Sequence, residues 1–167
     1  MDAAAKKAAL RMIPYGLYVL TTKASDGAVT AATVNWVTQT SFDPPLVAVA
    51  VKADSSSYSA VKTTRHFALN ILGKGQQKLA FSFFKPAQVA DGKISGEPFT
   101  DGSTGAPVLS NAPACVEFKV VEIVAQGDHH IVIGEAVNVH LPNPLTGRPD
   151  GSVLEMRDLG ENVFYGG

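Results

Sequence analysis

The pattern of apolar and polar positions along the chain predicts a protein built mainly from β-strands. Residues 16–22 and 28–41 are rich in Val and Thr, and Ser25-Asp26-Gly27 between them are turn residues, so these stretches form a hairpin of two strands. Asp43-Pro44-Pro45 ends the second strand, because proline cannot donate a hydrogen bond to a strand ladder. The first third of the chain is therefore expected to contribute paired strands.

Further apolar stretches supply the rest of a sheet. The sequence LVAVAV at 46–51 is apolar at every position, which favours a strand covered on both faces. The sequence HFALNIL at 66–72 returns as another strand. Residues 114–125 and 129–141 form a second hairpin around Gly127-Asp128. About six or seven strands with only short helices indicate a closed or nearly closed antiparallel barrel.

Helical patterns are short and lie between these strands. Asp2 is positioned to cap an Ala-rich helix that ends near Met12. A serine cluster offers caps for a helix over about 57–65, and apolar residues at helical spacing predict another over 76–85, which Pro86 ends. The Gly, Pro, Asp and Ser content rises from 87 to 112, which predicts an irregular excursion rather than a linker. We therefore expect one domain over residues 1–167.

Composition narrows the class of protein. Fourteen Lys and Arg against fifteen Asp and Glu leave a net charge of -1, so no basic field is available to hold nucleic acid or an anionic membrane. Charged residues make up 17% and apolar residues 46%, which excludes disorder and favours a buried interface. The single Cys115 cannot form an intramolecular disulfide, and no signal peptide or membrane span is evident. A cytoplasmic protein is expected.

Several common catalytic signatures are missing. The stretch Gly73–Lys78 lacks the third glycine of a dinucleotide fingerprint, and there is no Walker loop, HExxH or GxSxG motif. His129 and His130 are adjacent and would point to opposite faces of a strand, so they are poorly placed to share a metal ion. No metal site is predicted, and Cys115 is interpreted as a small buried hydrophobe.

Motifs in order along the chain resemble one known family. They are TVNWVTQTSFDPP at 33–45 followed by LVAVAV, HFALNIL, Gln77 with Leu79-Ala80 and Phe83-Phe84, Asp91-Gly92-Lys93-Ile94, Gly127-Asp128-His129 with Ile133-Gly134-Glu135, and the ending from Asp158 to Gly167. Together they resemble the flavin reductase-like family over essentially the whole chain. The resemblance implies an FMN-binding split β-barrel, mainly β and antiparallel with a few short helices.

The resemblance also implies a flavin site, with FMN as the cofactor and FAD as the alternative. Hydroxyls and amides at a helix start suit a phosphate, and a flavin ring needs apolar contact and polar partners at its edge. The residues expected to bind the cofactor are Thr33, Asn35, Trp36, Val37, Thr38, Ser55, Ser56, Ser57, Lys93, His129 and Tyr165. His129 is also the predicted catalytic residue, because an imidazole near the reduced flavin stabilises charge.

Plainer interpretations stay open beside each of these assignments. Trp36 would also suit the core, and the serine cluster would also serve as a simple capping turn. Lys93 follows an inserted Gly92, so Lys85 is the fallback cation, and either lysine would also suit a solvated surface. His129 would also suit a turn in which Asp128 caps it.

Three functions compete. The leading one is an FMN-binding oxidoreductase that takes hydride from NADH or NADPH and passes electrons to free flavin, ferric iron, oxygen or a protein partner. The second is a flavoredoxin-like electron carrier that works between redox proteins without turning over nicotinamide. The third is a ligand-binding barrel with no redox role. Family resemblance also implies a homodimer with flavin near the subunit boundary.

Overall fold

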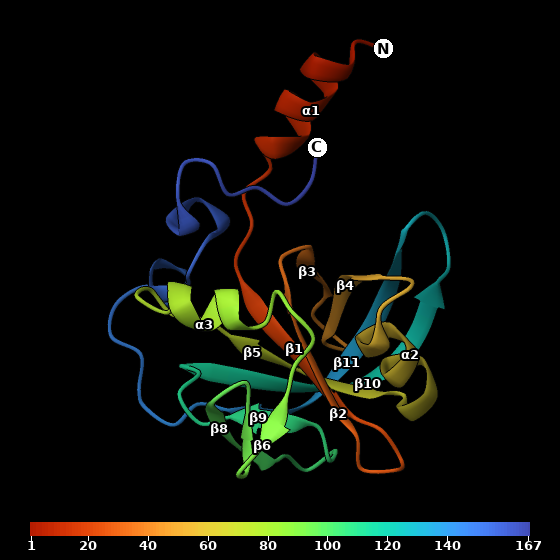
Figure 1. The fold of residues 1–167 in the computed structure, drawn as a ribbon, viewed down its shortest axis with the longest axis vertical. Coiled ribbons are helices and arrows are strands. Elements are labelled where there is room, and N and C mark those ends of the chain that lie inside the picture. Colours follow the sequence, from red (N-terminus) through yellow and green to blue (C-terminus); the bar gives the residue numbers. More distant parts are fainter.

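The computed structural model describes all 167 residues and consists mainly of antiparallel strands (Figure 1). One curled sheet has seven strands in the order β2-β1-β5-β10-β11-β4-β3, and a second has four in the order β6-β7-β8-β9. The large sheet comprises β1 (Tyr18–Lys23), β2 (Val29–Val34), β3 (Val37–Ser41), β4 (Leu46–Lys52), β5 (His66–Ile71), β10 (Ala114–Val124) and β11 (His129–His140). The predicted mainly β, antiparallel fold is confirmed.

The predicted continuous strand over 28–41 is wrong, because the chain breaks at Asn35-Trp36. Before the break, β2 pairs with β1; after it, β3 pairs with β4. At the break the backbone amide of Ala50 donates to the Trp36 carbonyl at 3.0 Å. Since β2 and β3 are the two edges of the seven-stranded sheet, this two-residue connection requires the sheet to curl until its edges approach each other.

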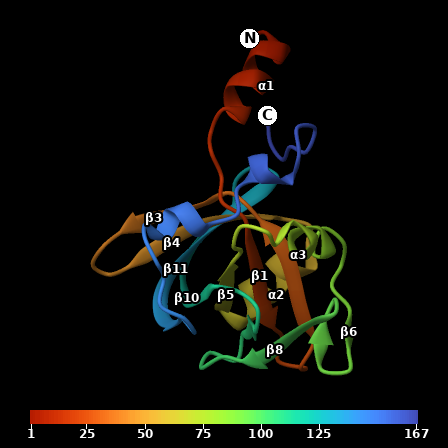
Figure 2. The ribbon, with the colours of Figure 1, turned by 90° about the vertical axis from the view of Figure 1, so that its left-hand side faces the viewer.

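Three helices lie outside the barrel wall. They are α1 (Ala3–Arg11), α2 (Ser56–Thr64) and α3 (Gln77–Ser82). The Asp2 side chain accepts a hydrogen bond from the Ala5 amide at 2.6 Å, as the predicted cap requires, yet α1 buries no residue. Figures 1 and 2 show α1 standing away from the barrel beside the C-terminus. No helix combines the length and apolar character needed to cross a membrane.

The segment from 87 to 112 is more regular than predicted. It contains β6 (Val89–Ala90), β7 (Lys93–Ile94), β8 (Glu97–Asp101) and β9 (Pro107–Leu109). Asp91 and Gly92 turn β6 into β7, and Ser95 and Gly96 turn β7 into β8; all four residues have positive φ angles. Strands of two residues leave no alternating pattern in a sequence, which explains why the segment reads as irregular.

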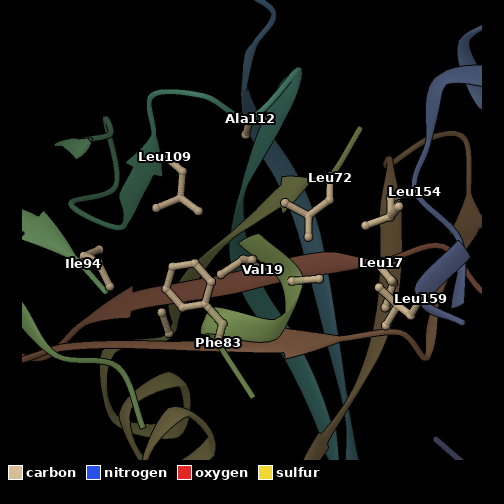
Figure 3. Close-up of a cluster of buried hydrophobic side chains, with 11 residues drawn as sticks. Leu17, Val19, Leu72, Phe83, Ile94, Leu109, Ala112, Leu154 and Leu159 are labelled. Atoms are coloured by element: carbon tan, nitrogen blue, oxygen red, sulfur yellow. The ribbon is translucent and has the colours of Figure 1, made fainter. Parts of the chain in front are cut away.

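Two apolar clusters hold these layers together. In the first, Phe83 packs with Val19 and Ile94 and so joins α3 to both sheets (Figure 3). In the second, inside the barrel, the rings of Phe67 and Phe118 stack with centroids 4.9 Å apart. A Cβ atom on Gly134 would lie 2.9 Å from both of these side chains, so the stack requires glycine at this position.

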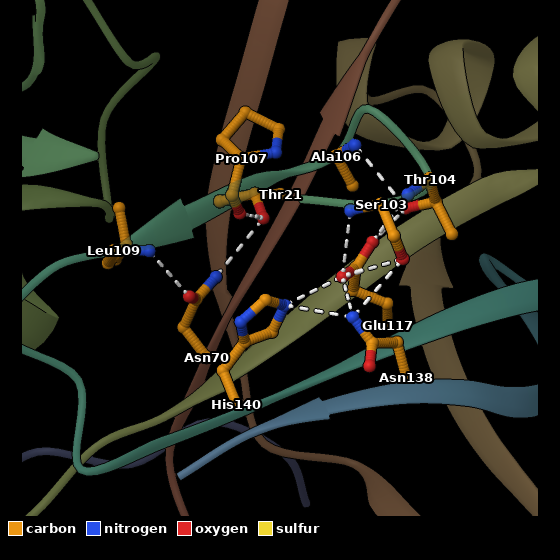
Figure 4. Close-up of polar contacts among 10 residues, drawn as sticks. All are labelled: Thr21, Asn70, Ser103, Thr104, Ala106, Pro107, Leu109, Glu117, Asn138 and His140. Carbon is orange, nitrogen blue, oxygen red and sulfur yellow. Dashed lines mark hydrogen bonds and ion pairs between the residues drawn. The ribbon is translucent and has the colours of Figure 1, made fainter. Parts of the chain in front are cut away.

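A buried carboxylate ties the second sheet to the first (Figure 4). Glu117 is fully buried on β10 and accepts hydrogen bonds from the backbone amides and hydroxyls of Ser103 and Thr104, between β8 and β9. Asn138 donates to it at 2.9 Å, and His140 Nε2 lies 2.6 Å from its Oε1. Burial opposes ionisation, but these hydrogen bonds outweigh it and hold the pKa of Glu117 well below its usual range.

Cys115 lies two residues before Glu117 and is buried, as predicted. Burial, with a smaller contribution from the Glu117 charge, raises the pKa of its thiol to about 12. The thiol therefore stays protonated near neutral pH and is a poor nucleophile.

Candidate functional site

A cavity of about 620 Å³ opens where the break between β2 and β3 meets the start of α2 and the end of α3. Its wall comes from segments that are distant in sequence. The lining residues are Leu17, Ala31, Ala32, Thr33, Val34, Asn35, Ala50, Val51, Lys52, Asp54, Ser55, Ser56, Ser57, Phe83, Phe84, Lys85, Pro86, His129, Met156 and Tyr165. The volume lies within the usual range for small-molecule and cofactor sites.

The start of α2 gives one end of the cavity an anion-binding character. Ser55 caps the helix: its hydroxyl accepts from the Tyr58 amide at 3.1 Å and donates to the Lys52 carbonyl at 2.7 Å. The hydroxyls of Ser56 and Ser57 make no hydrogen bond within the chain, and the first amides of a helix have no intrahelical acceptor. These groups, with the helix dipole, suit a phosphate.

Two lysines reach the same cavity. Lys52 is paired with Asp54, with nitrogen–oxygen distances of 2.9 and 3.0 Å, and this hydrogen bond raises the pKa of Lys52. Lys85 is exposed and has no ion pair, so its charge is available to a ligand. Lys93, the cation favoured by the resemblance, lies exposed in β7 and does not line the cavity. The fallback cation, Lys85, does line the cavity, because the chain that leaves α3 follows the cavity wall from Phe84 to Pro86.

The end of β2 forms a polar wall. Thr33 lines the cavity, but its hydroxyl is used by the fold, since it donates to the Ala80 carbonyl at 2.7 Å. Asn35 is 4% exposed, and its side chain makes only one long hydrogen bond, from Nδ2 to the Tyr165 carbonyl at 3.5 Å. A buried amide with spare hydrogen-bonding capacity is costly unless a ligand completes it. Asn35 therefore fits the polar edge of a flavin.

His129 stands at an aromatic corner of the cavity. Its Nδ1 lies 2.9 Å from Asp128 Oδ1, and its Nε2 lies 2.7 Å from the Tyr165 hydroxyl. This hydrogen bond from His129 holds the pKa of Asp128 below its usual value, while burial raises the pKa of Tyr165. With the carboxylate accepting from Nδ1, a neutral imidazole accepts from Tyr165 at Nε2. His129 is thus capped by Asp128 and also faces the cavity.

Trp36 lies behind this corner rather than in the cavity wall. Its ring centroid is 4.8 Å from that of His129 and 5.5 Å from that of Tyr165. Its indole nitrogen is buried without a hydrogen-bond partner. Val37 and Thr38, predicted together with Trp36, continue into β3 and do not line the cavity. The break after Asn35 accounts for this, because it turns β3 away to pair with β4.

The structure therefore brings together seven of the predicted site residues: Thr33, Asn35, Ser55, Ser56, Ser57, His129 and Tyr165. Sequence reasoning missed Lys52, Asp54 and Met156. The position of Lys52 at the end of β4, three residues before the serine cluster, is a usable signal. Nothing in the local sequence places Met156 there. No cluster of three or more His, Cys, Asp or Glu side chains is arranged to hold a metal ion.

The residues present fit FMN. Unused hydroxyls and amides at α2, with Lys85, suit the phosphate, and the incompletely bonded Asn35 suits the ring edge. Apolar contact is available from Ala31, Phe83 and their neighbours.

Known proteins are similar to this chain in sequence and in fold. Residues 10–155 match the family described as "Flavin reductase like domain". An NADH:FMN oxidoreductase of Rhodococcus qingshengii is 36% identical over 135 residues, which cover 80% of this chain and 68% of that protein. The styrene monooxygenase flavin reductase of Pseudomonas putida S12 matches with a TM-score of 0.71 at 28% identity, covering 86% of this chain and 89% of that chain.

A second solved structure agrees. An NADH:FAD oxidoreductase of Streptomyces globisporus matches with a TM-score of 0.68 at 28% identity, covering 77% of this chain and 71% of that chain. The family match spans most of the chain and includes β2, the start of α2 and His129, which carry the cavity. This chain belongs to the flavin reductase-like family.

Proposed function

We propose that the protein is an FMN-binding oxidoreductase that takes hydride from NADH or NADPH and passes electrons to free flavin, ferric iron, oxygen or a protein partner. The observation that carries this proposal is the cavity itself. Its wall contains both an anion-binding helix start and a buried, incompletely bonded amide, which is what a flavin mononucleotide requires.

The residues divide the work of binding. Ser56 and Ser57 donate to the phosphate, and Lys85 supplies the positive charge. Asn35 holds the polar edge of the ring and so orients it in the cavity. The bound flavin supplies the hydride and electron chemistry, which no side chain of the cavity provides.

His129 tunes the electrostatics of the site. Asp128 accepts a hydrogen bond from Nδ1 and fixes the ring orientation, so that Nε2 is directed to the Tyr165 hydroxyl in the cavity wall. An imidazole held in this way exchanges a proton at Nε2 and stabilises negative charge that develops nearby. His129 is therefore the residue that we assign to catalysis.

FMN is the cofactor that we favour, and FAD is the alternative. The named activities of the relatives include NADH with FMN and NADH with FAD. Among electron donors NADH has that support, and NADPH remains the second candidate. FMN ends at its phosphate, which we place at the start of α2, whereas the adenylate part of FAD would have to extend beyond that helix start.

The protein is expected to act in the cytoplasm as a homodimer. Val137, Val139 and Leu141 on or just after β11 are 49%, 61% and 50% exposed, so this end of β11 presents apolar side chains to solvent. Pairing of two copies would cover such a surface. A redox protein is the other partner that we consider.

A flavoredoxin-like electron carrier is the second candidate function. Tyr165 stands at the cavity mouth with Trp36 behind it, and this bulk favours restricted access for a nicotinamide. Rapid mixing of the FMN-loaded protein separates the two: a carrier is reduced only by a reduced protein donor, whereas the enzyme is reduced directly by NADH or NADPH.

Equilibrium binding tests the proposed cofactor. Flavin-free protein titrated with FMN, riboflavin and FAD should bind FMN most tightly, and riboflavin at least about tenfold more weakly because it lacks the phosphate. Protein that takes up none of the three would refute the proposal. Equal affinity for FMN and riboflavin would refute the phosphate site.

A further inference from the structure

The last residues of the chain connect α1 to the cavity. Arg11 Nε donates to the Gly166 carbonyl at 3.1 Å, and its guanidinium carbon lies 4.3 Å from the ring centroid of Phe164. A Cβ atom on Gly167 would lie 2.9 Å from the Lys7 carbonyl, which shows how closely the tail follows the helix. Figures 1 and 2 both show the C-terminus beside α1.

The same short segment reaches the cavity between these contacts. Tyr165 lines the cavity, and its hydroxyl bonds His129 Nε2 at 2.7 Å. Its carbonyl accepts from Asn35 at 3.5 Å, and a Cβ atom on Gly166 would lie 3.1 Å from the Trp36 ring. The tail therefore occupies a hydrogen-bonding position on each of the two residues assigned to the flavin ring.

Val163 packs against the first apolar cluster, but the contacts of the residues after it are few and open to solvent. Phe164 and Tyr165 are 50% and 47% exposed, and α1 buries no residue at all. Segments with few buried apolar contacts open locally at low free-energy cost. Tyr165 lines the cavity yet is half exposed, so it stands at the mouth, where an entering molecule must pass.

We propose that residues 164–167 form a reversible lid over the cavity, and that Arg11 is the positioning residue that holds the lid closed. The lid controls access of the nicotinamide of the electron donor. This inference rests on the proposed function for the identity of the entering molecule, but the Arg11 latch itself does not. A nicotinamide that approaches His129 competes with Tyr165, so closure lowers its apparent affinity.

Trp36 allows the latch to be tested without flavin. It is the only tryptophan in the chain, and Tyr165 and Gly166 cover it. The test uses the flavin-free full chain. Arg11→Met removes the hydrogen bond to the Gly166 carbonyl and the positive charge over Phe164, and methionine is also a good helix former, so α1 is preserved. We expect acrylamide quenching of Trp36 to increase about twofold in this variant through a shift toward the open lid.

Lys6→Met is the matched control, because Lys6 lies exposed on α1 and its side chain makes no ion pair or hydrogen bond. Its quenching should equal that of the parent. Tyr165→Phe, which removes only the hydroxyl at His129, should also increase the quenching of Trp36. Equal quenching in the parent and in Arg11→Met would overturn the latch.

Rapid mixing then tests access. FMN affinity is first measured for each variant. Failure to bind FMN would count against the proposed function, but it would not affect the quenching result, which is obtained without flavin. In FMN-loaded protein, Arg11→Met should lower the apparent Kd for NADH about threefold relative to the parent and to Lys6→Met. Increased quenching with an unchanged apparent Kd would overturn the role of the lid in access.

Discussion

Lys52 and His129 are direct partners across β4 and β11. Because Ser55 follows Lys52 by three residues, this pairing brings the anion-binding start of α2 to the same end of the barrel as the imidazole. A slip of one residue between these strands would turn His129 to the opposite face. The register between β4 and β11 therefore places the phosphate-binding serines and His129 in the same cavity.

The serines at the start of α2 are predicted to discriminate the phosphate. Replacing both Ser56 and Ser57 by alanine should weaken FMN binding about tenfold, since charge-assisted hydrogen bonds are lost, and leave riboflavin binding nearly unchanged. Ser59→Ala, on an exposed position of the same helix, is the control. Fluorescence titration measures all three. Equal losses for FMN and riboflavin would show that these hydroxyls do not contact the phosphate.

His129 is predicted to accelerate flavin reduction. His129→Ala should lower the limiting reduction rate by about a hundredfold or more, the usual contribution of a positioned proton-exchanging group. His66→Gln, outside the cavity, should leave that rate unchanged. Rapid mixing with saturating NADH makes the comparison. A rate for His129→Ala within twofold of the parent would contradict the assignment.

Glu117 is predicted to stabilise the link between the two sheets. Glu117→Gln should lower the free energy of unfolding by about 2 kcal/mol or more, because the buried donors around it lose a charged acceptor. Glu122→Gln, exposed on the same strand, should change it by less than about 0.5 kcal/mol. Denaturant unfolding measures both, and similar values for the two variants would argue against the link.

The same carboxylate predicts a pH dependence. Its pKa in the folded protein lies below the ordinary value of 4.5, so the unfolded chain binds the proton more readily. The stabilisation is fully present above that value and is lost as the pH falls below it. Unfolding measured across this range should show a steeper loss of stability in the parent than in Glu117→Gln. Equal pH dependence of the free energy of unfolding in the two proteins would contradict this role of Glu117.

Gly134 is predicted to be intolerant of any side chain. Gly134→Ala places a methyl group against the stacked Phe67 and Phe118 and should cost about 1–3 kcal/mol. Gly151→Ala, where an added Cβ meets nothing within 4 Å, is the control and should be nearly neutral. Thermal unfolding compares them. An unaffected Gly134→Ala protein would mean that the stack relaxes freely.

The sequence predicted the elements that have strong local signals and missed those that depend on tertiary contacts. The Asp2 cap, the serine-capped start of α2 and the hairpin around Gly127 were readable because capping and turn residues act locally. The break at Asn35-Trp36 was not, since the apolar pattern continues through it and only pairing with β4 redirects the chain.

The site was predictable to a similar extent. Hydroxyls at a predicted helix start pointed to the serines, and motif resemblance pointed to His129 and Tyr165; the structure gathers all of them at one cavity. The resemblance favoured Lys93 over Lys85, but the position of either lysine depends on how the segment after α3 folds. The contact between Arg11 and the tail joins opposite ends of the chain, and no local sequence pattern predicts it.

The central claim is that this protein binds FMN and reduces it with a nicotinamide. Anaerobic rapid mixing of the FMN-loaded protein with NADH, and separately with NADPH, tests it most directly by following the visible flavin absorption. We predict that the yellow colour bleaches with a rate that saturates with nicotinamide concentration, and faster with at least one of the two donors than for free FMN. Flavin that stays oxidised with both donors would contradict the account.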